Sequence, residues 1–139
     1  MQLDVRGPRF AAAVTTLVLI AILITGNGWV ALAQTVVFAL GAISARLSPY
    51  GTLFRVLVRP RLGPPTAVEP AEPVRFAQGV GFVFLSVGTV ALLAGATAVG
   101  LVAVALALVA AFLNAAFGLC LGCEAYLLVR RLTSRTSAA

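Results

Sequence analysis

Residues 98–129 read AVGLVAVALALVAAFLNAAFGLCLGCEAYLLV, an apolar run of 32 residues with a single charged side chain, Glu124. Further apolar runs precede it, at about 10–25, 29–45 and 76–94. A helix needs about 20 apolar residues to cross the hydrocarbon core of a bilayer. Because 61% of the 139 residues are hydrophobic, a soluble domain of this size could not bury them all. The sequence therefore predicts one all-α membrane domain, residues 1–139, with four transmembrane helices.

The last apolar run is too long for one straight crossing. At 1.5 Å per residue it would measure about 48 Å as a helix, against a hydrocarbon core of roughly 30 Å. We expect this helix to tilt, to protrude or to break, with Gly118 and Gly122 as the places where a break is favoured. Short glycine-containing turns at 26–28 and 95–97 would connect the spans within each pair.

The basic residues are distributed asymmetrically around these runs. All ten are arginine: Arg6, Arg9, Arg46, Arg55, Arg59, Arg61, Arg75, Arg130, Arg131 and Arg135. With four spans they all fall on one side of the membrane, and the positive-inside rule assigns that side to the cytoplasm. We therefore expect a multi-pass protein of a bacterial cytoplasmic membrane, with both termini and the connection 46–75 in the cytoplasm. The expected partner is the lipid bilayer and not nucleic acid, because no lysine-rich run or aromatic basic face is present.

The middle connection contains a segment suited to the membrane interface. Residues 50–59 read YGTLFRVLVR, which is apolar on most sides but carries two arginines. Such a segment favours the interface, because long arginine side chains reach water while the apolar side chains stay in lipid. We expect an interfacial amphipathic segment between the second and third spans.

The chain also suggests an internal duplication. The tripeptide RFA at 9–11 recurs at 75–77, 66 residues later, and each copy opens a span, a glycine turn and a second span. Two spans per unit would give tandem hairpins that enter the membrane in the same direction, a parallel repeat. The alternative is that two apolar hairpins resemble each other by chance.

Cys120 and Cys123, the only cysteines, form a CxxC pair at the cytoplasmic end of the last run. A bacterial cytoplasm keeps thiols reduced, so we expect a reduced dithiol. Three interpretations remain open: redox or sulfur chemistry, metal binding, and packing of small residues between helices. Two thiols supply only two ligands and the chain has no histidine, so we expect neither a metal nor another cofactor.

Glu124 lies beside the cysteine pair and would disfavour a thiolate there. An arginine could neutralise it, and we expect Glu124 to meet Arg75, Arg55 or Arg59. The candidate catalytic residues are therefore Cys120, Cys123 and Glu124. The candidate binding residues are Arg75, Gln78, Arg55 and Arg59, since the arginines would attract a partner or an anionic sulfur species.

Three stretches resemble a known family of uncharacterised bacterial membrane proteins. They are DVRGPRFAA at 4–12, PVRFAQGVG at 73–81 and GLCLGCEAYLL at 118–128. The sequence is similar in these positions to the family called domain of unknown function 4395. The residues that carry the resemblance are Arg75, Phe76, Ala77, Gln78, Gly81, Cys120, Gly122 and Cys123. The resemblance implies an integral-membrane protein without an established activity, and it favours thiol or sulfur traffic with a thioredoxin-like or rhodanese-like protein.

Two functions of different classes follow. In the first, the dithiol exchanges electrons or sulfane sulfur with a soluble cytoplasmic partner. In the second, the protein is a non-enzymatic membrane scaffold or a small transport subunit, in which the cysteines only pack. A homo-oligomer is compatible with either function.

Overall fold

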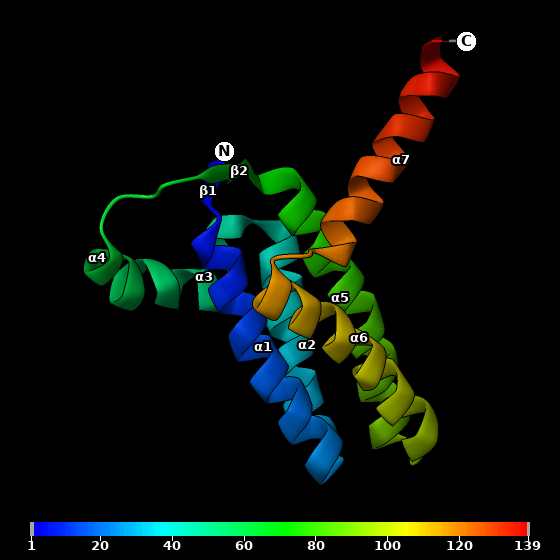
Figure 1. Ribbon diagram of the computed structural model, residues 1–139. Coiled ribbons are helices and arrows are strands. Elements are labelled where there is room, and N and C mark those ends of the chain that lie inside the picture. The colour runs from blue at the N-terminus through cyan, green and yellow to red at the C-terminus, as the bar shows by residue number, and fades with distance from the viewer. Residues whose placement is uncertain (1, 139) are drawn as a thin grey trace.

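The structure, a computed structural model, describes residues 2–138, with side chains to residue 134, so the side chain of Arg135 lies outside the described part. Four apolar helices form a bundle: α1 (Arg6–Thr25), α2 (Gly28–Ile43), α5 (Ala71–Leu93) and α6 (Thr97–Phe117). A further helix, α7 (Leu121–Ala138), leaves the bundle at one end (Figure 1). The predicted all-α class is confirmed for these elements.

Three of the helices, α1, α5 and α6, are long enough and apolar enough to cross a membrane. Helix α2 is also apolar but has 16 residues, about 24 Å of helix. It ends at Ile43 because Ser44 is extended and its side chain accepts a hydrogen bond from the Arg46 N–H, which starts the next element. The apolar helices indicate a membrane protein.

Helices of different hairpins pack against each other more extensively than α1 and α2 do within the first hairpin. Helix α2 packs most extensively against α5, and α1 packs against α6. A core cluster of buried side chains lies between these helices and consists of Leu19, Ile22, Ala31, Phe38, Leu85, Val104 and Ala107. The hydroxyl oxygens of Thr35 on α2 and Thr89 on α5 lie 2.9 Å apart in a buried hydrogen bond. Close helix packing and buried hydroxyl pairs are the usual means by which helices associate in lipid.

The connection between α2 and α5 lies at the same end of the bundle as α7 and the N-terminus (Figure 1). It consists of η1 (Ala45–Leu47), α3 (Pro49–Leu53), η2 (Phe54–Val58) and α4 (Arg59–Leu62). Phe54 is buried against Phe10 of α1, with ring centroids 5.8 Å apart, whereas Val56 and Leu57 are exposed. One face of this segment is therefore fixed on the bundle, and the other face presents apolar side chains outward.

A small antiparallel sheet, which the sequence did not predict, joins the two ends of this region. Strand β1 (Gln2–Asp4) pairs with β2 (Val68–Pro70), with Leu3 opposite Glu69. Next to it, Arg6 forms an ion pair of 2.7 Å with Asp4 and donates hydrogen bonds to the carbonyls of Leu62 and Gly63. The Arg6 hydrogen bond lowers the pKa of Asp4 below its ordinary range. The sheet thus ties the start of the chain to the segment that leads into α5.

Candidate functional site

The helix break expected in the long apolar run occurs at Gly118. Its φ of 69° lies in the left-handed region, where glycine has no steric penalty. The Gly118 N–H donates to the Asn114 carbonyl at 3.0 Å, and the Leu119 N–H donates to the Leu113 carbonyl at 3.3 Å. The bond from the Gly118 N–H, four residues back along the chain, closes the C-terminus of α6 as in the αL motif. The run 98–129 is therefore divided between α6 and α7.

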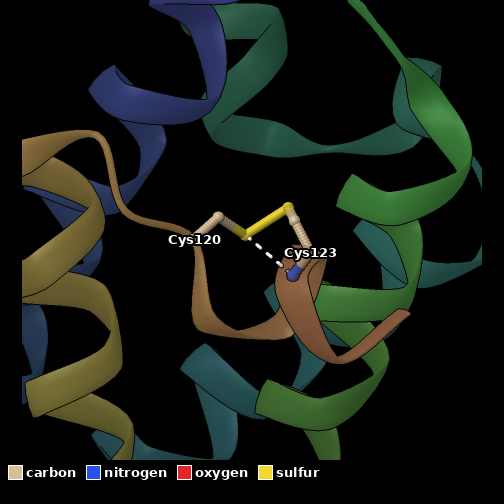
Figure 2. The surroundings of a disulfide bond; sticks show 2 residues. All are labelled: Cys120 and Cys123. Atoms are coloured by element: carbon tan, nitrogen blue, oxygen red, sulfur yellow. Dashed lines mark hydrogen bonds between the residues drawn. A yellow bond between two sulfur atoms is a disulfide. The ribbon is translucent and has the colours of Figure 1, made fainter. Parts of the chain in front are cut away.

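The break places the CxxC pair at the N-terminus of α7 and not inside a continuous helix. Cys120 directly precedes α7, and its Sγ accepts a hydrogen bond of 3.1 Å from the Cys123 N–H (Figure 2). The Cys120 carbonyl accepts the first bond of the new helix from the Glu124 N–H, at 3.0 Å. Cys120 thus acts as the N-cap residue of α7. Unpaired N–H groups and the helix dipole favour negative charge on a side chain at this position.

The two cysteines are joined by a disulfide, with their Cα atoms 5.2 Å apart. This separation lies within the range that a disulfide requires, below about 7 Å. The expected reduced state differs from the bonded state in the structure. The reason is local, since the turn at Gly118 and the first turn of α7 bring both sulfurs together without further movement of the backbone. Both side chains are half-buried, so they are neither enclosed in the core nor fully exposed.

The residues around the pair anchor α7 on α5. A Cβ atom added to Gly122 would lie 2.5 Å from the Ala77 Cβ and 2.6 Å from the Ala77 Cα, so only glycine permits this approach. The rings of Phe76 on α5 and Tyr126 on α7 lie 5.6 Å apart. Gly122, one of the two residues between the cysteines, therefore positions them against α5, and it has the packing role that the sequence had suggested as one alternative.

A cavity of about 540 Å³ lies beneath the disulfide. Its walls come mainly from the first half of α1, the first half of α5, the second half of α6 and the start of α7, with Phe38 of α2 and Glu69 of β2. Most lining side chains are apolar, and the polar ones are Arg9, Thr15, Glu69, Gln78, Asn114, Cys120 and Cys123. The disulfide therefore lies at the boundary of an apolar space inside the bundle.

A second, smaller cavity of about 160 Å³ lies beside the first turns of α1. Its polar lining includes Asp4, Arg55, Arg59 and Gln78. Gln78 thus borders both cavities. Arg55 also donates hydrogen bonds to the Arg46 carbonyl and to the Thr52 hydroxyl, within its own segment.

The structure does not bring Glu124 to any of the expected arginines, which corrects that prediction. Arg75 instead donates to the carbonyls of Ala42 and Ile43 at the C-terminus of α2, at 3.1 and 2.7 Å. Glu124 is exposed in the first turn of α7, where the helix dipole favours an acidic side chain. In the part of the chain that the structure describes, the ion pair present is Asp4–Arg6. Arg75 binds the carbonyls at the end of α2, which lack helical partners, whereas the exposed carboxylate of Glu124 is solvated by water.

Arg9 is a site residue that the sequence reasoning missed. Its guanidinium donates a hydrogen bond of 3.2 Å to the Ala115 carbonyl at the C-terminus of α6, next to the segment that carries the cysteines. The signal was present, because Arg9 and Arg75 occupy the same position in the two RFA copies. Arg75 caps α2 and Arg9 caps α6, so each RFA arginine caps the second helix of the other hairpin.

Glu69 and Asn114 were also missed as parts of this site. Glu69 lies on β2 at the edge of the large cavity, and burial raises the pKa of its carboxyl. Glu69 lies in a proline-rich stretch of the chain, and the pairing of β2 with β1 accounts for its partial burial. No cluster of three or more His, Cys, Asp or Glu side chains that could hold a metal ion is found among residues 2–134.

These features define a class: a helical membrane protein in which a CxxC disulfide caps a helix at the edge of an apolar cavity. Residues 3–131 match the family described as Domain of unknown function (DUF4395), and the chain belongs to this family. No curated protein and no solved structure matches the chain.

Proposed function

We propose that this chain carries out thiol–disulfide exchange with a soluble, thioredoxin-like protein through Cys120 and Cys123. The observation that carries the proposal is the position of Cys120 as N-cap of α7, with its Sγ bonded to the Cys123 N–H. A thiolate at a helix N-terminus is stabilised by the N–H groups and the helix dipole, which makes it both a good nucleophile and a good leaving group.

The exchange needs two steps. A thiolate of the reduced partner attacks the Cys120 Sγ, so a mixed disulfide forms and Cys123 leaves as a thiolate that takes up a proton. The second thiol of the partner then loses its proton and attacks the sulfur of the partner's first cysteine in the mixed disulfide. Cys120 leaves as a thiolate and takes up a proton. The partner loses two electrons as its disulfide forms, and the Cys120–Cys123 disulfide gains them.

The proposed site faces the cytoplasm. The N-terminal segment, the middle connection and α7 all lie at one end of the bundle (Figure 1). The described arginines belong to these elements or to the first turns of α1 and α5, which adjoin them. A four-span arrangement in a bacterial cytoplasmic membrane would place this end inside the cell by the positive-inside rule. Reporter fusions at residue 27 and after residue 139 test this topology, since they should report opposite compartments; the same compartment at both sites would contradict it.

A duplication of the two hairpins would be consistent with this arrangement. The reciprocal capping by Arg9 and Arg75 supports a two-fold relation that exchanges α1 with α5 and α6 with α2. The interfacial segment that starts at α3 and the cysteine segment would then be equivalent tails of the two units. Superposition of 9–45 on 75–113 by a rotation about the membrane normal tests the relation, and an inverted relation would refute it.

The exchange itself is tested by trapping. Purified Cys123→Ser protein should form a stable mixed disulfide through Cys120 when mixed with a thioredoxin-like protein whose resolving cysteine is replaced by serine, after activation of one of the thiols. Cys120→Ser should form far less, and neither single variant should reduce or oxidise the partner catalytically. Catalytic exchange at the wild-type rate in Cys123→Ser would rule out the paired mechanism. The scaffold function, in which the cysteines only pack, would then be favoured by the Gly122–Ala77 contact.

A further inference from the structure

The cavity beneath the disulfide has the size of a small-molecule site. Such sites have volumes of roughly 300–1,000 Å³ and apolar walls with a few polar groups. This cavity measures about 540 Å³, and its apolar lining includes Phe38, Phe84 and Leu106. Cys120 and Cys123 both border it. A molecule held there would therefore contact the dithiol directly.

The location of the cavity determines how a ligand would reach it. Three of the helices that form its walls, α1, α5 and α6, are long and apolar enough to cross a membrane. A ligand would therefore enter from the lipid phase, which selects a molecule soluble in the bilayer. Charged nucleotide cofactors are disfavoured because most of the lining is apolar and, among the described residues that line it, Arg9 is the one basic side chain.

The polar groups near the cysteines suit a neutral acceptor with carbonyl oxygens. The side-chain amides of Gln78 and Asn114 both border the cavity. Each of these amides carries an N–H₂ group that can donate a hydrogen bond to a carbonyl oxygen. An amide donor and an apolar wall together recognise a flat ring with carbonyl groups.

Building on the proposed exchange, we infer that this cavity binds a lipid-soluble quinone, which accepts the two electrons of the reduced Cys120–Cys123 pair. The two thiols lose two electrons and two protons, and the bond between the two Sγ atoms forms. The quinone gains both electrons and both protons at its carbonyl oxygens and leaves as the hydroquinone. Electrons thus pass from the soluble dithiol partner through Cys120 and Cys123 into the membrane.

The test uses the full chain in detergent micelles, reduced and then freed of reductant under anaerobic conditions. The probe is ubiquinone-1, whose fully substituted ring resists direct addition of thiols. We expect one hydroquinone per protein by absorbance, with loss of both free thiols measured in the same sample. The rate with ubiquinone-1 and the rate of exchange with a reduced thioredoxin-like protein are measured separately.

Ala110 borders the cavity on α6, and Ala110→Phe should fill part of it. We expect the rate with ubiquinone-1 to fall by about tenfold or more, the equivalent of a loss of about 1.4 kcal/mol, with the rate of partner exchange unchanged. The matched control is Ala98→Phe, an exposed position on the same helix that does not border the cavity. A second variant, Asn114→Leu, keeps a similar side-chain volume and should raise the KM for ubiquinone-1, because the quinone loses an amide donor.

Each outcome separates the two proposals. Wild-type protein that exchanges with the thioredoxin-like partner but forms no hydroquinone refutes the quinone inference and leaves the proposed function intact. Protein that exchanges with neither refutes the proposed function. Equal rates with ubiquinone-1 in Ala110→Phe, Asn114→Leu and Ala98→Phe show that the quinone reacts outside the cavity, which overturns the site.

Discussion

Replacement of Gly122 by alanine tests whether the contact between α7 and α5 positions the dithiol. The added Cβ would lie 2.5 Å from the Cβ and 2.6 Å from the Cα of Ala77, and ordinary contacts between such atoms are about 1 Å longer or more. One of these atoms belongs to the backbone of α5, so rotation of a side chain cannot relieve the clash. The first turn of α7 must move away from α5.

We expect Gly122→Ala to destabilise the protein by about 1–3 kcal/mol, the usual cost of overpacking. A loss of stability would be informative, because alanine is otherwise favoured over glycine in a helix by about 1 kcal/mol. Thermal unfolding in detergent, followed by circular dichroism, measures the stability. The displacement should also slow partner exchange, because Cys120 and Cys123 lie on either side of the shifted residue.

The matched control for this experiment is Gly79→Ala on α5. A Cβ atom at Gly79 would meet only the Ala42 Cβ, at 4.0 Å, which is an ordinary contact. This variant should be as stable as the wild type or more stable, by up to about 1 kcal/mol. If Gly122→Ala were equally stable and exchanged thiols at the wild-type rate, the contact with Ala77 would have no role in positioning the site.

Four further changes test the helix ends and the N-terminal region, each by thermal unfolding in detergent. Arg9→Gln should lower stability by about 0.5–1 kcal/mol, because the C-terminus of α6 loses a cationic donor; an unchanged stability would contradict the capping role. Gly118→Ala should cost about 1–2 kcal/mol, because alanine is disfavoured at a φ of 69°, and a smaller loss would mean that the break tolerates other residues. The raised pKa of Glu69 means that the folded state binds a proton more tightly than the unfolded state. Stability should therefore fall as the pH rises above 4.5, the ordinary pKa of a glutamate. Glu69→Gln should remove this decline and be more stable than the wild type at pH 7. The lowered pKa of Asp4 has the opposite sign, so its contribution is present above pH 3.8 and is lost as the pH falls further; Asp4→Asn should be less stable at pH 7 but equal to the wild type in strong acid.

The sequence by itself determined the helical membrane-type fold and the division of its last apolar run. Both depend on properties that act locally along the chain. About twenty consecutive apolar residues favour a helix in lipid whatever lies beside it, and a run of 32 residues exceeds what one crossing can accommodate. Gly118 then provides the break, because it adopts the left-handed conformation without a penalty. The spacing of Cys120 and Cys123 likewise ensured that their sulfurs could meet.

The tertiary structure decided which groups serve as partners. Arg75 was expected to meet Glu124, but it binds the carbonyls at the end of α2, and Arg9 does the same at the end of α6. Spacing along the chain does not reveal which helix ends lie beside an arginine. The same limit applies to the pairing of β1 with β2, which partly buries Glu69. The cavity beneath the disulfide is lined by residues from separate parts of the chain, so it exists only once α1, α2, α5, α6, α7 and β2 are packed together.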